Sequence, residues 1–278
     1  MDMMAKMRSL LRKSVGKGAV WLVLGLALRE YRQRYQGSLL GPLWPFLYTC
    51  AMVALYSFAF SVVLKVKWDQ AGISAGGGIA DPPFWLVLMA GQMLYFLVAE
   101  ILLKSPTLIT AVPNYVKKII FPLETLSVVS LLVALVNAFI TFAVMLTLSW
   151  IFVGFSWHIL LAPLVFASLA CWCLGLGWLL GSIGVYFRDL QQVMPLFSQM
   201  LLFATPVFYP LSAIPEAYRG YLNFNPLTPH ITALRDILLW HQLPEFWPLT
   251  LTAMAGVLFA VFGYVVFQKL RDSFADVL

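Results

Sequence analysis

The chain has 278 residues, of which 62% are hydrophobic and only 11% are charged. Soluble domains carry about half apolar and about a quarter charged residues, so this composition excludes a soluble globular protein. It also excludes a disordered chain, because a sequence this apolar cannot stay solvated. The three cysteines lie within apolar runs, so the sequence predicts neither a disulfide framework nor a zinc site.

Six apolar runs have the length of membrane-spanning helices, which need about 20 residues to cross a bilayer. In chain order they cover residues 43–64, 84–103, 126–153, 159–187, 193–209 and 249–267. Five of them carry no charge, and the second carries only Glu100. The runs are too long for β-barrel strands and lack their alternation. The sequence therefore predicts an all-α membrane protein with six transmembrane helices.

Most Lys and Arg residues fall on one side of this topology. They lie in the N-terminal segment 1–42, in the second-to-third and fourth-to-fifth loops, and in the tail 268–278. The positive-inside rule then places both termini in the cytoplasm, with the six-span domain over residues 43–267. This topogenic role accounts for the net charge of +6, so nucleic acid is not expected as a partner.

The N-terminal segment resembles a signal peptide only superficially. Its apolar run, residues 19–28, is too short to span, and it ends in Arg29 and Glu30 without a small-residue cleavage site. We expect an amphipathic helix lying on the cytoplasmic membrane surface. A cluster of orientation charges with no further role is the alternative.

Two proline-rich loops are candidates for function. The cytoplasmic loop 105–122 has room for one short helix at residues 114–120, which carries Lys117 and Lys118. This helix would dock a soluble partner, or its charges would only set the orientation of the protein in the membrane. In the outer loop 211–248, Thr228 is expected to cap a helix that runs to about Trp240 with Arg235 off its apolar face. Two half-helices hinged at Asn225-Pro226 would form a re-entrant gate. An interfacial pair of amphipathic helices is the alternative.

Polar side chains within the spans are few. Glu100 is expected to pair with Lys104 four residues later, and Asn137 and Gln199 to bond neighbouring helices. A chain of buried carboxylates, as in proton-coupled transporters, is missing from the sequence. The aromatic residues of the first span, Trp44, Tyr48 and Tyr56, would suit a sugar-stacking pore, although the residues alone favour the interfacial belt and lipid contact.

Catalytic and nucleotide-binding motifs are also missing. The sequence has no H-E-x-x-H, no G-x-S-x-G and no G-x-x-x-x-G-K-[ST]. We therefore expect no enzyme activity and no cofactor in this chain, and any ATP to be bound by another chain. An intramembrane transferase would need buried acid and base residues that the sequence does not offer.

Four segments, in order, resemble those of polysaccharide-exporting ABC transporter permeases. Residues 29–44 follow the pattern R-x-x-x-x-R-Y-x-x-S-x-L-G-x-x-W, and residues 116–124 follow V-x-K-x-x-F-P-x-E. Residues 188–207 resemble the R-D-L…T-P-V stretch, and residues 225–235 the N-P…R element. The similarity covers residues 20–270 and departs mildly at Glu30, where the family commonly has Asp.

The resemblance implies a homodimer of six-span subunits in the bacterial inner membrane, with two copies of a nucleotide-binding subunit that binds ATP and Mg. Its substrate would be a lipid-linked polysaccharide. O-antigen is the favoured substrate. The alternatives are export of capsule or teichoic acid, and export of a small molecule or lipid by a permease with the same fold.

The resemblance also assigns roles to individual residues. It implies an aromatic channel lined by Trp44, Tyr48 and Tyr56, and an outer gate at Asn225, Pro226 and Arg235. The surface that couples to the ATPase would comprise Arg29, Arg34, Lys117, Lys118, Phe121, Pro122 and Glu124.

Overall fold

The computed structural model describes residues 20–63, 82–117, 121–210, 214–216, 220, 222 and 224–277, and the regular structure within them is entirely helical. A helix over residues 20–35, called here the N-terminal helix, comes first. The longer elements that follow are α2 (Trp44–Tyr56), the π-helix η2 (Ser57–Val63), α3 (Phe84–Lys104), α5 (Thr125–Phe152), α6 (Ala162–Tyr186), α7 (Leu190–Phe203), α9 (Leu227–Arg235) and α10 (Phe246–Arg271). Shorter ones are η1 (Gly41–Leu43), η3 (Ser105–Thr107), α4 (Pro113–Lys117), η4 (Trp157–Leu161), η6 (Asp236–Trp240) and α11 (Phe274–Val277).

Four helical stretches are long and apolar enough to cross a membrane. They cover Phe84–Thr107, Thr125–Phe152, Trp157–Tyr186 and Phe246–Arg271, which correspond to the second, third, fourth and sixth predicted spans. The first predicted span forms the shorter apolar helix Trp44–Ala59, and the fifth forms α7, which has 14 residues. The described part is thus an all-helical membrane protein, while the count of six spans stays a prediction.

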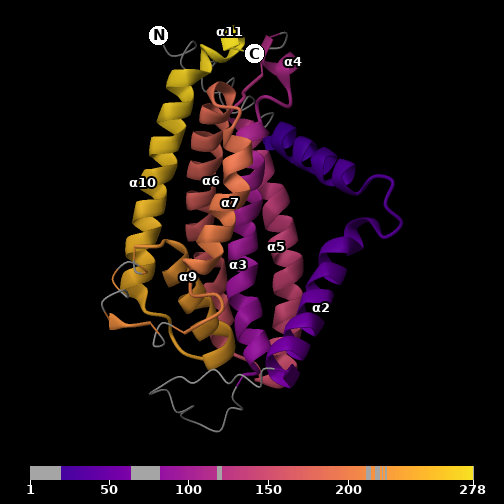
Figure 1. The fold of residues 1–278 in the computed structure, drawn as a ribbon, viewed down its shortest axis with the longest axis vertical. Coiled ribbons are helices and arrows are strands. Elements are labelled where there is room, and N and C mark those ends of the chain that lie inside the picture. The colour runs from indigo at the N-terminus through magenta and orange to yellow at the C-terminus, as the bar shows by residue number, and fades with distance from the viewer. Residues whose placement is uncertain are drawn as a thin grey trace, which may run out of the picture.

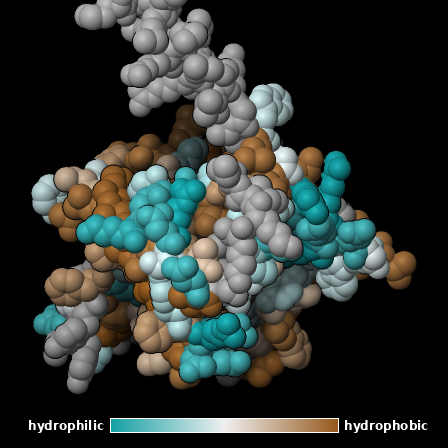
Figure 2. Space-filling model, turned by 90° about the horizontal axis from the view of Figure 1, so that it is seen from above, coloured by the Kyte–Doolittle hydropathy of each residue, from teal (hydrophilic) through white to brown (hydrophobic). Residues whose placement is uncertain are grey.

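The long helices run along one axis of the molecule (Figure 1). Most residues of α3 are buried, because neighbouring helices surround it. The C-terminus and α4 lie at one end, called here the upper end, and α9 lies toward the opposite, lower end. Figure 2 looks onto the upper end and shows hydrophilic side chains in several patches there.

Glycines on α6 let neighbouring backbones approach closely. A Cβ atom on Gly263 of α10 would lie 2.6 Å from the carbonyl oxygen of Gly175. A Cβ atom on Gly177 would lie 3.1 Å from that of Ser127, and one on Gly184 would overlap the η3 backbone. Small residues of this kind allow tight helix packing in membranes. These glycines of α6 therefore serve the packing of the bundle itself.

Candidate functional site

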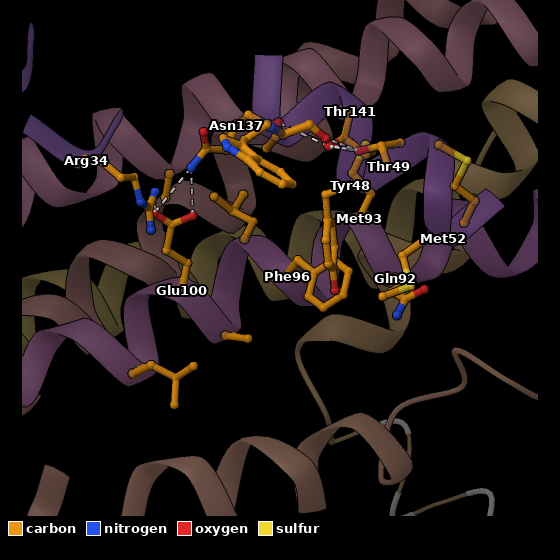
Figure 3. Close-up of a pocket in the computed structure, with 18 of the residues that line it drawn as sticks. Arg34, Tyr48, Thr49, Met52, Gln92, Met93, Phe96, Glu100, Asn137 and Thr141 are labelled. Carbon is orange, nitrogen blue, oxygen red and sulfur yellow. Dashed lines mark hydrogen bonds and ion pairs between the residues drawn. The ribbon is translucent and has the colours of Figure 1, made fainter. Parts of the chain in front are cut away.

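A cavity of about 680 Å³ lies between the N-terminal helix, α2, α3 and α5 (Figure 3). α2, α3 and α5 line it with residues three or four positions apart, which is the spacing of one helix face, and the N-terminal helix adds Arg34 and Tyr35. From α3 these include Met89, Met93, Phe96 and Glu100, and from α5 Ala134, Asn137 and Thr141. The same spacing on α3 is visible in the sequence, but a continuously apolar helix gives no sign of which face meets a cavity.

The three aromatic residues singled out in the first span all line this cavity. Trp44 donates from Nε1 to Ser38 Oγ over 2.7 Å, which fixes its ring. Tyr48 packs edge-on against Phe96 with ring centroids 5.9 Å apart. Trp44 and Tyr48 are nonetheless 49% and 46% exposed. One face of α2 therefore presents aromatic rings that a ligand can still reach.

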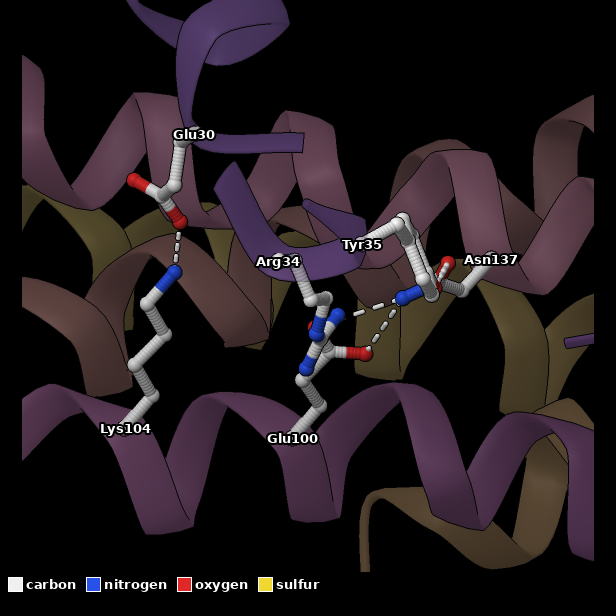
Figure 4. Close-up of polar contacts among 6 residues, drawn as sticks. All are labelled: Glu30, Arg34, Tyr35, Glu100, Lys104 and Asn137. Carbon is white, nitrogen blue, oxygen red and sulfur yellow. Dashed lines mark hydrogen bonds and ion pairs between the residues drawn. The ribbon is translucent and has the colours of Figure 1, made fainter. Parts of the chain in front are cut away.

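A polar network forms the upper rim of the cavity (Figure 4). Arg34 Nη1 lies 2.5 Å from Glu100 Oε1, and the other carboxylate oxygen of Glu100 accepts from Asn137 Nδ2 at 3.1 Å. Tyr35 donates its hydroxyl to Asn137 Oδ1 over 3.2 Å. Burial raises the pKa of the Tyr35 hydroxyl, so it stays a donor at neutral pH. The prediction that Asn137 bonds a neighbouring helix is confirmed.

The predicted pair between Glu100 and Lys104 within α3 is wrong. Lys104 pairs with Glu30 of the N-terminal helix, and Glu100 pairs with Arg34 (Figure 4). Each helix carries an acid and, four residues later, a base, so packing in antiparallel directions brings the acid of each helix next to the base of the other. These two ion pairs fasten the N-terminal helix to α3.

Arg235, which the sequence analysis placed off the apolar face of its helix, is buried at the end of α9. Its side chain donates to three main-chain carbonyl oxygens: Nε to Val87 over 3.1 Å, Nη1 to Pro206 over 2.8 Å and Nη2 to Val207 over 2.8 Å. A Cβ atom on Gly91 would lie 2.8 Å from Nη2, so a larger residue there would push on the guanidinium. Arg235 therefore fastens α9, the 204–209 turn and the first turn of α3 together.

Thr228 does not cap α9, whose N-cap residue is Pro226; Asn225, one residue earlier, bonds the first N–H group of the helix instead. Its Oδ1 accepts from Leu227 N over 3.0 Å, so α9 begins at Leu227 and not at Pro229. Its Nδ2 donates to Ala204 O and to Thr205 Oγ1, over 3.0 and 2.8 Å. The helical segment does continue through η6 to Trp240, as predicted. Both Asn225 and Arg235 thus hold the same turn against α9.

His230 anchors α9 to α6. Its Nδ1 lies 2.6 Å from Pro226 O, a carbonyl that can only accept, so this nitrogen carries the proton. Its Nε2 lies 2.8 Å from Ser168 Oγ and accepts from that hydroxyl. Both ring nitrogens are used by the fold. In the described part of the chain, no group of three or more His, Cys, Asp or Glu residues is placed to hold a metal ion.

The residues expected to couple to an ATPase fall into three places. Arg34 belongs to the cavity rim, and Arg29 is exposed on the N-terminal helix. At the upper end, Arg271 Nη1 lies 3.2 Å from Glu124 Oε2, and its Nη2 donates to Phe121 O over 3.4 Å. Pro122, which follows Phe121, is half-buried. The sequence analysis missed this pairing with Arg271, which is far away in the chain.

The two predicted coupling lysines cannot be placed with the rest. Lys118 lies outside the described residues, and Lys117 is described only as the last residue of α4. Near them, Tyr115 of α4 stacks on Phe121 with ring centroids 4.8 Å apart. Both rings pack against a buried cluster that includes Phe267 and Phe274. The loop that carries the lysines is therefore anchored to the C-terminal end of α10.

Comparisons of the sequence with known proteins point to membrane transporters. The sequence profile described as ABC-2 type transporter matches residues 22–239. The chain is 29% identical over 258 residues to the O-antigen export system permease protein RfbA of Myxococcus xanthus, covering 92% of this chain and 94% of the relative. It is 22% identical over 262 residues to the RfbA of Klebsiella pneumoniae, covering 92% and 95%. It is 25% identical over 257 residues to the polysialic acid transport protein KpsM of Escherichia coli, covering 90% and 94%.

The long apolar helices indicate a membrane protein with several spans. The matched profile identifies the family of membrane proteins to which it belongs. The profile spans most of the chain, from the N-terminal helix to η6. The chain belongs to the ABC-2 type transporter family. The resemblance inferred from the four sequence segments is thereby confirmed.

Proposed function

We propose that this chain is the membrane subunit of an ATP-driven exporter that carries a lipid-linked polysaccharide across the bacterial inner membrane. Three near-full-length relatives that are named for O-antigen export or polysialic acid transport support this function. O-antigen is the favoured cargo, because the relative with the highest identity of these three is an O-antigen permease. A capsular polysaccharide is the alternative that the KpsM similarity supports.

The observation that carries the proposal is the placement of Trp44, Tyr48 and Tyr56 on one cavity. Sugar rings stack their C–H faces on aromatic planes, and several weak contacts of this kind let a polymer slide. One tight site would stall it, because conduction requires binding that is easily reversed. In the proposed homodimer, this aromatic face of α2 would line the path of the polymer.

The proposed ATPase partner would act through the upper end. Two copies of a nucleotide-binding subunit would bind ATP and Mg and push on the N-terminal helix and on the loop that carries Lys117. The N-terminal helix is fastened to α3 through Glu100, and α3 is fastened to the outer turn through Val87 and Arg235. Those two points on α3 are about 20 Å apart at 1.5 Å per residue. A movement of α3 as a rigid rod would therefore reach the proposed outer gate at Asn225, Pro226 and Arg235.

Deletion of the gene, followed by gel analysis of surface and intracellular polysaccharide, tests the proposal. We expect polymer to disappear from the surface and lipid-linked polymer to accumulate inside, with both effects reversed by a plasmid copy of the gene. The accumulated sugar would identify the cargo as O-antigen or capsule. Unchanged surface glycans would refute polysaccharide export.

A small-molecule or lipid exporter is a second candidate, because the cavity has the size of ordinary small-ligand pockets. ATPase activity of the purified complex separates the two functions. Stimulation by the glycolipid and not by small amphipathic compounds would support polysaccharide export. The reverse pattern would support the second candidate.

A further inference from the structure

The chain turns back onto the upper end of the bundle after α10. α10 ends at Arg271, and the short helix α11 begins at Phe274 (Figure 1). The carbonyl oxygen of Leu270 accepts from Ser273 N and from the hydroxyl of Tyr186 on α6, over 3.2 Å in each case. A carbonyl oxygen has two lone pairs, so it can accept both bonds at once. The turn between the two helices is therefore held on α6.

Phe274 is the buried residue of α11. Its side chain is 0% exposed, whereas residues 275–277 are exposed. Its ring centroid lies 5.6 Å from that of Phe267 on α10 and 6.2 Å from that of Tyr186. Both separations fall in the range of about 4.5–7 Å that aromatic pairs prefer. One aromatic side chain therefore holds this short helix against α6 and α10.

The segment 105–124 between α3 and α5, called here the α4 loop, packs on the same cluster. Ile109 before α4 and Leu123 after it are buried in the cluster that contains Phe274. Tyr115 packs against that cluster from α4 itself. α4 has only five residues, and a helix this short is not stable alone in water. Its position therefore depends on the side chains that pack against it.

The exit of the α4 loop is held by side chains from two helices. Arg271 of α10 donates from Nη2 to Phe121 O and pairs through Nη1 with Glu124. Trp178 of α6 donates from Nε1 to Glu124 O over 3.0 Å. The entrance also lies directly on α6, where a Cβ atom on Gly184 would overlap the η3 backbone. The α4 loop thus contacts α6 or α10 at its entrance, its centre and its exit.

These contacts determine which helices would follow a movement of the α4 loop. α6 and α10 meet backbone to backbone at Gly175 and Gly263, so a movement of one is passed to the other. The N-terminal helix is instead fastened to α3 by its two ion pairs. The two segments on which the ATPase would push therefore connect to different parts of the bundle.

We propose that Arg271 and Phe274 form a clamp, called here the C-terminal clamp, that positions the α4 loop for the ATPase partner and ties this loop to α6 and α10. The inference rests on the proposed function, in which the partner pushes on the loop that carries Lys117. Both are positioning residues, because they act through the loop and do not have to touch partner, nucleotide or cargo. Without the clamp, the push would move the loop alone and export would fall.

Hydrogen exchange of the purified full chain in detergent micelles tests the clamp directly. Main-chain amides between residues 108 and 115 donate to nearby carbonyls, so their exchange reports opening of the α4 loop. We expect Phe274→Ala to speed exchange over residues 108–117 at least tenfold. Val277→Ala, at an exposed position of the same helix, should change it less than twofold, and exchange over α3 should stay the same in both variants. Wild-type exchange of the loop in Phe274→Ala would overturn the proposal.

Complementation of the deletion strain tests the consequence for export. Phe274→Ala should lower surface polysaccharide at least fivefold while the amount of permease in the membrane stays within twofold of wild type. Phe274→Leu keeps an apolar side chain in the cluster and should restore at least half of the polymer, whereas Val277→Ala should resemble wild type. Normal surface polysaccharide with Phe274→Ala, or a loss of polymer that only follows a loss of permease, would overturn the proposal.

Arg271 variants test the clamp without disturbing the aromatic cluster. Arg271→Met removes the bond to Phe121 O and the pair with Glu124, whereas Arg271→Lys keeps the charge. We expect Arg271→Met to speed exchange over residues 121–126 and to lower export, each at least threefold, and Arg271→Lys to recover at least half of both effects. Wild-type exchange and export in Arg271→Met would contradict the clamp.

The two kinds of measurement separate the clamp from the proposed function. Unchanged surface glycans in the deletion strain would refute polysaccharide export. The exchange measurements need neither the ATPase partner nor polysaccharide, so they decide in that case as well whether the clamp holds the α4 loop.

Discussion

Replacing Arg235 by methionine tests whether its guanidinium holds the 204–209 turn. Arg235→Met keeps much of the side-chain volume but removes three hydrogen bonds to the carbonyls of Val87, Pro206 and Val207. Hydrogen bonds between helices in membranes average about 0.6 kcal/mol. Those to charged groups contribute about 1.5–3 kcal/mol in soluble proteins. Because the three bonds share one donor group and are not additive, we expect a loss of about 2–5 kcal/mol in the free energy of unfolding.

Unfolding by sodium dodecyl sulfate in mixed micelles, followed by circular dichroism, measures this loss. Arg235→Lys should be intermediate, because an ammonium cannot reproduce the planar fork that reaches three acceptors. Arg271→Met is the matched control, since it breaks a partly exposed ion pair with Glu124 and should cost no more than about 1 kcal/mol. A loss below about 1 kcal/mol for Arg235→Met would refute the role of the guanidinium in holding the turn.

Three further predictions concern the upper end of the molecule. Glu30→Lys alone should lower the free energy of unfolding. Adding Lys104→Glu should recover about 0.5–1 kcal/mol of the loss in a double-mutant cycle. A coupling energy of zero would contradict the pair between the two helices. Asn137→Leu removes the amide that links Tyr35 to Glu100. Limited proteolysis should then cleave the N-terminal helix at least several-fold faster. An unchanged cleavage rate would contradict this link. Reversing the charges of Lys117 and Lys118 together should abolish export while the protein remains inserted, and normal surface polysaccharide would rule out this loop as the ATPase contact.

Composition and run length were enough to predict the helical membrane class, because an uninterrupted run of about 20 apolar residues is typical of a helix that crosses a bilayer. The four long spans follow from this argument directly. The fifth run was less informative, since a turn after Phe203 ends α7, which has 14 residues. Hydropathy measures how apolar a run is, but not where its helix ends.

The partners of charged residues were harder to predict. Glu100 and Lys104 have ideal spacing for a pair within α3, yet each finds its partner on the N-terminal helix 70 or so positions away. Arg235 likewise bonds carbonyls from two distant segments, which a sequence pattern does not reveal. Local spacing states which pairs are possible, whereas tertiary packing decides between them. The motifs shared with the family identified Arg34 and Arg235 without indicating what they contact.

Translocation in a reconstituted system tests polysaccharide export most directly. The full chain and its ATPase partner would be placed in vesicles that carry lipid-linked polysaccharide on the ATPase side, and a glycosidase on that side would report how much polymer remains accessible. Export predicts that ATP and Mg make the polymer resistant to the enzyme, and that a hydrolysis-deficient partner leaves it sensitive. Polymer that stays fully accessible while the complex hydrolyses ATP would contradict the proposed function.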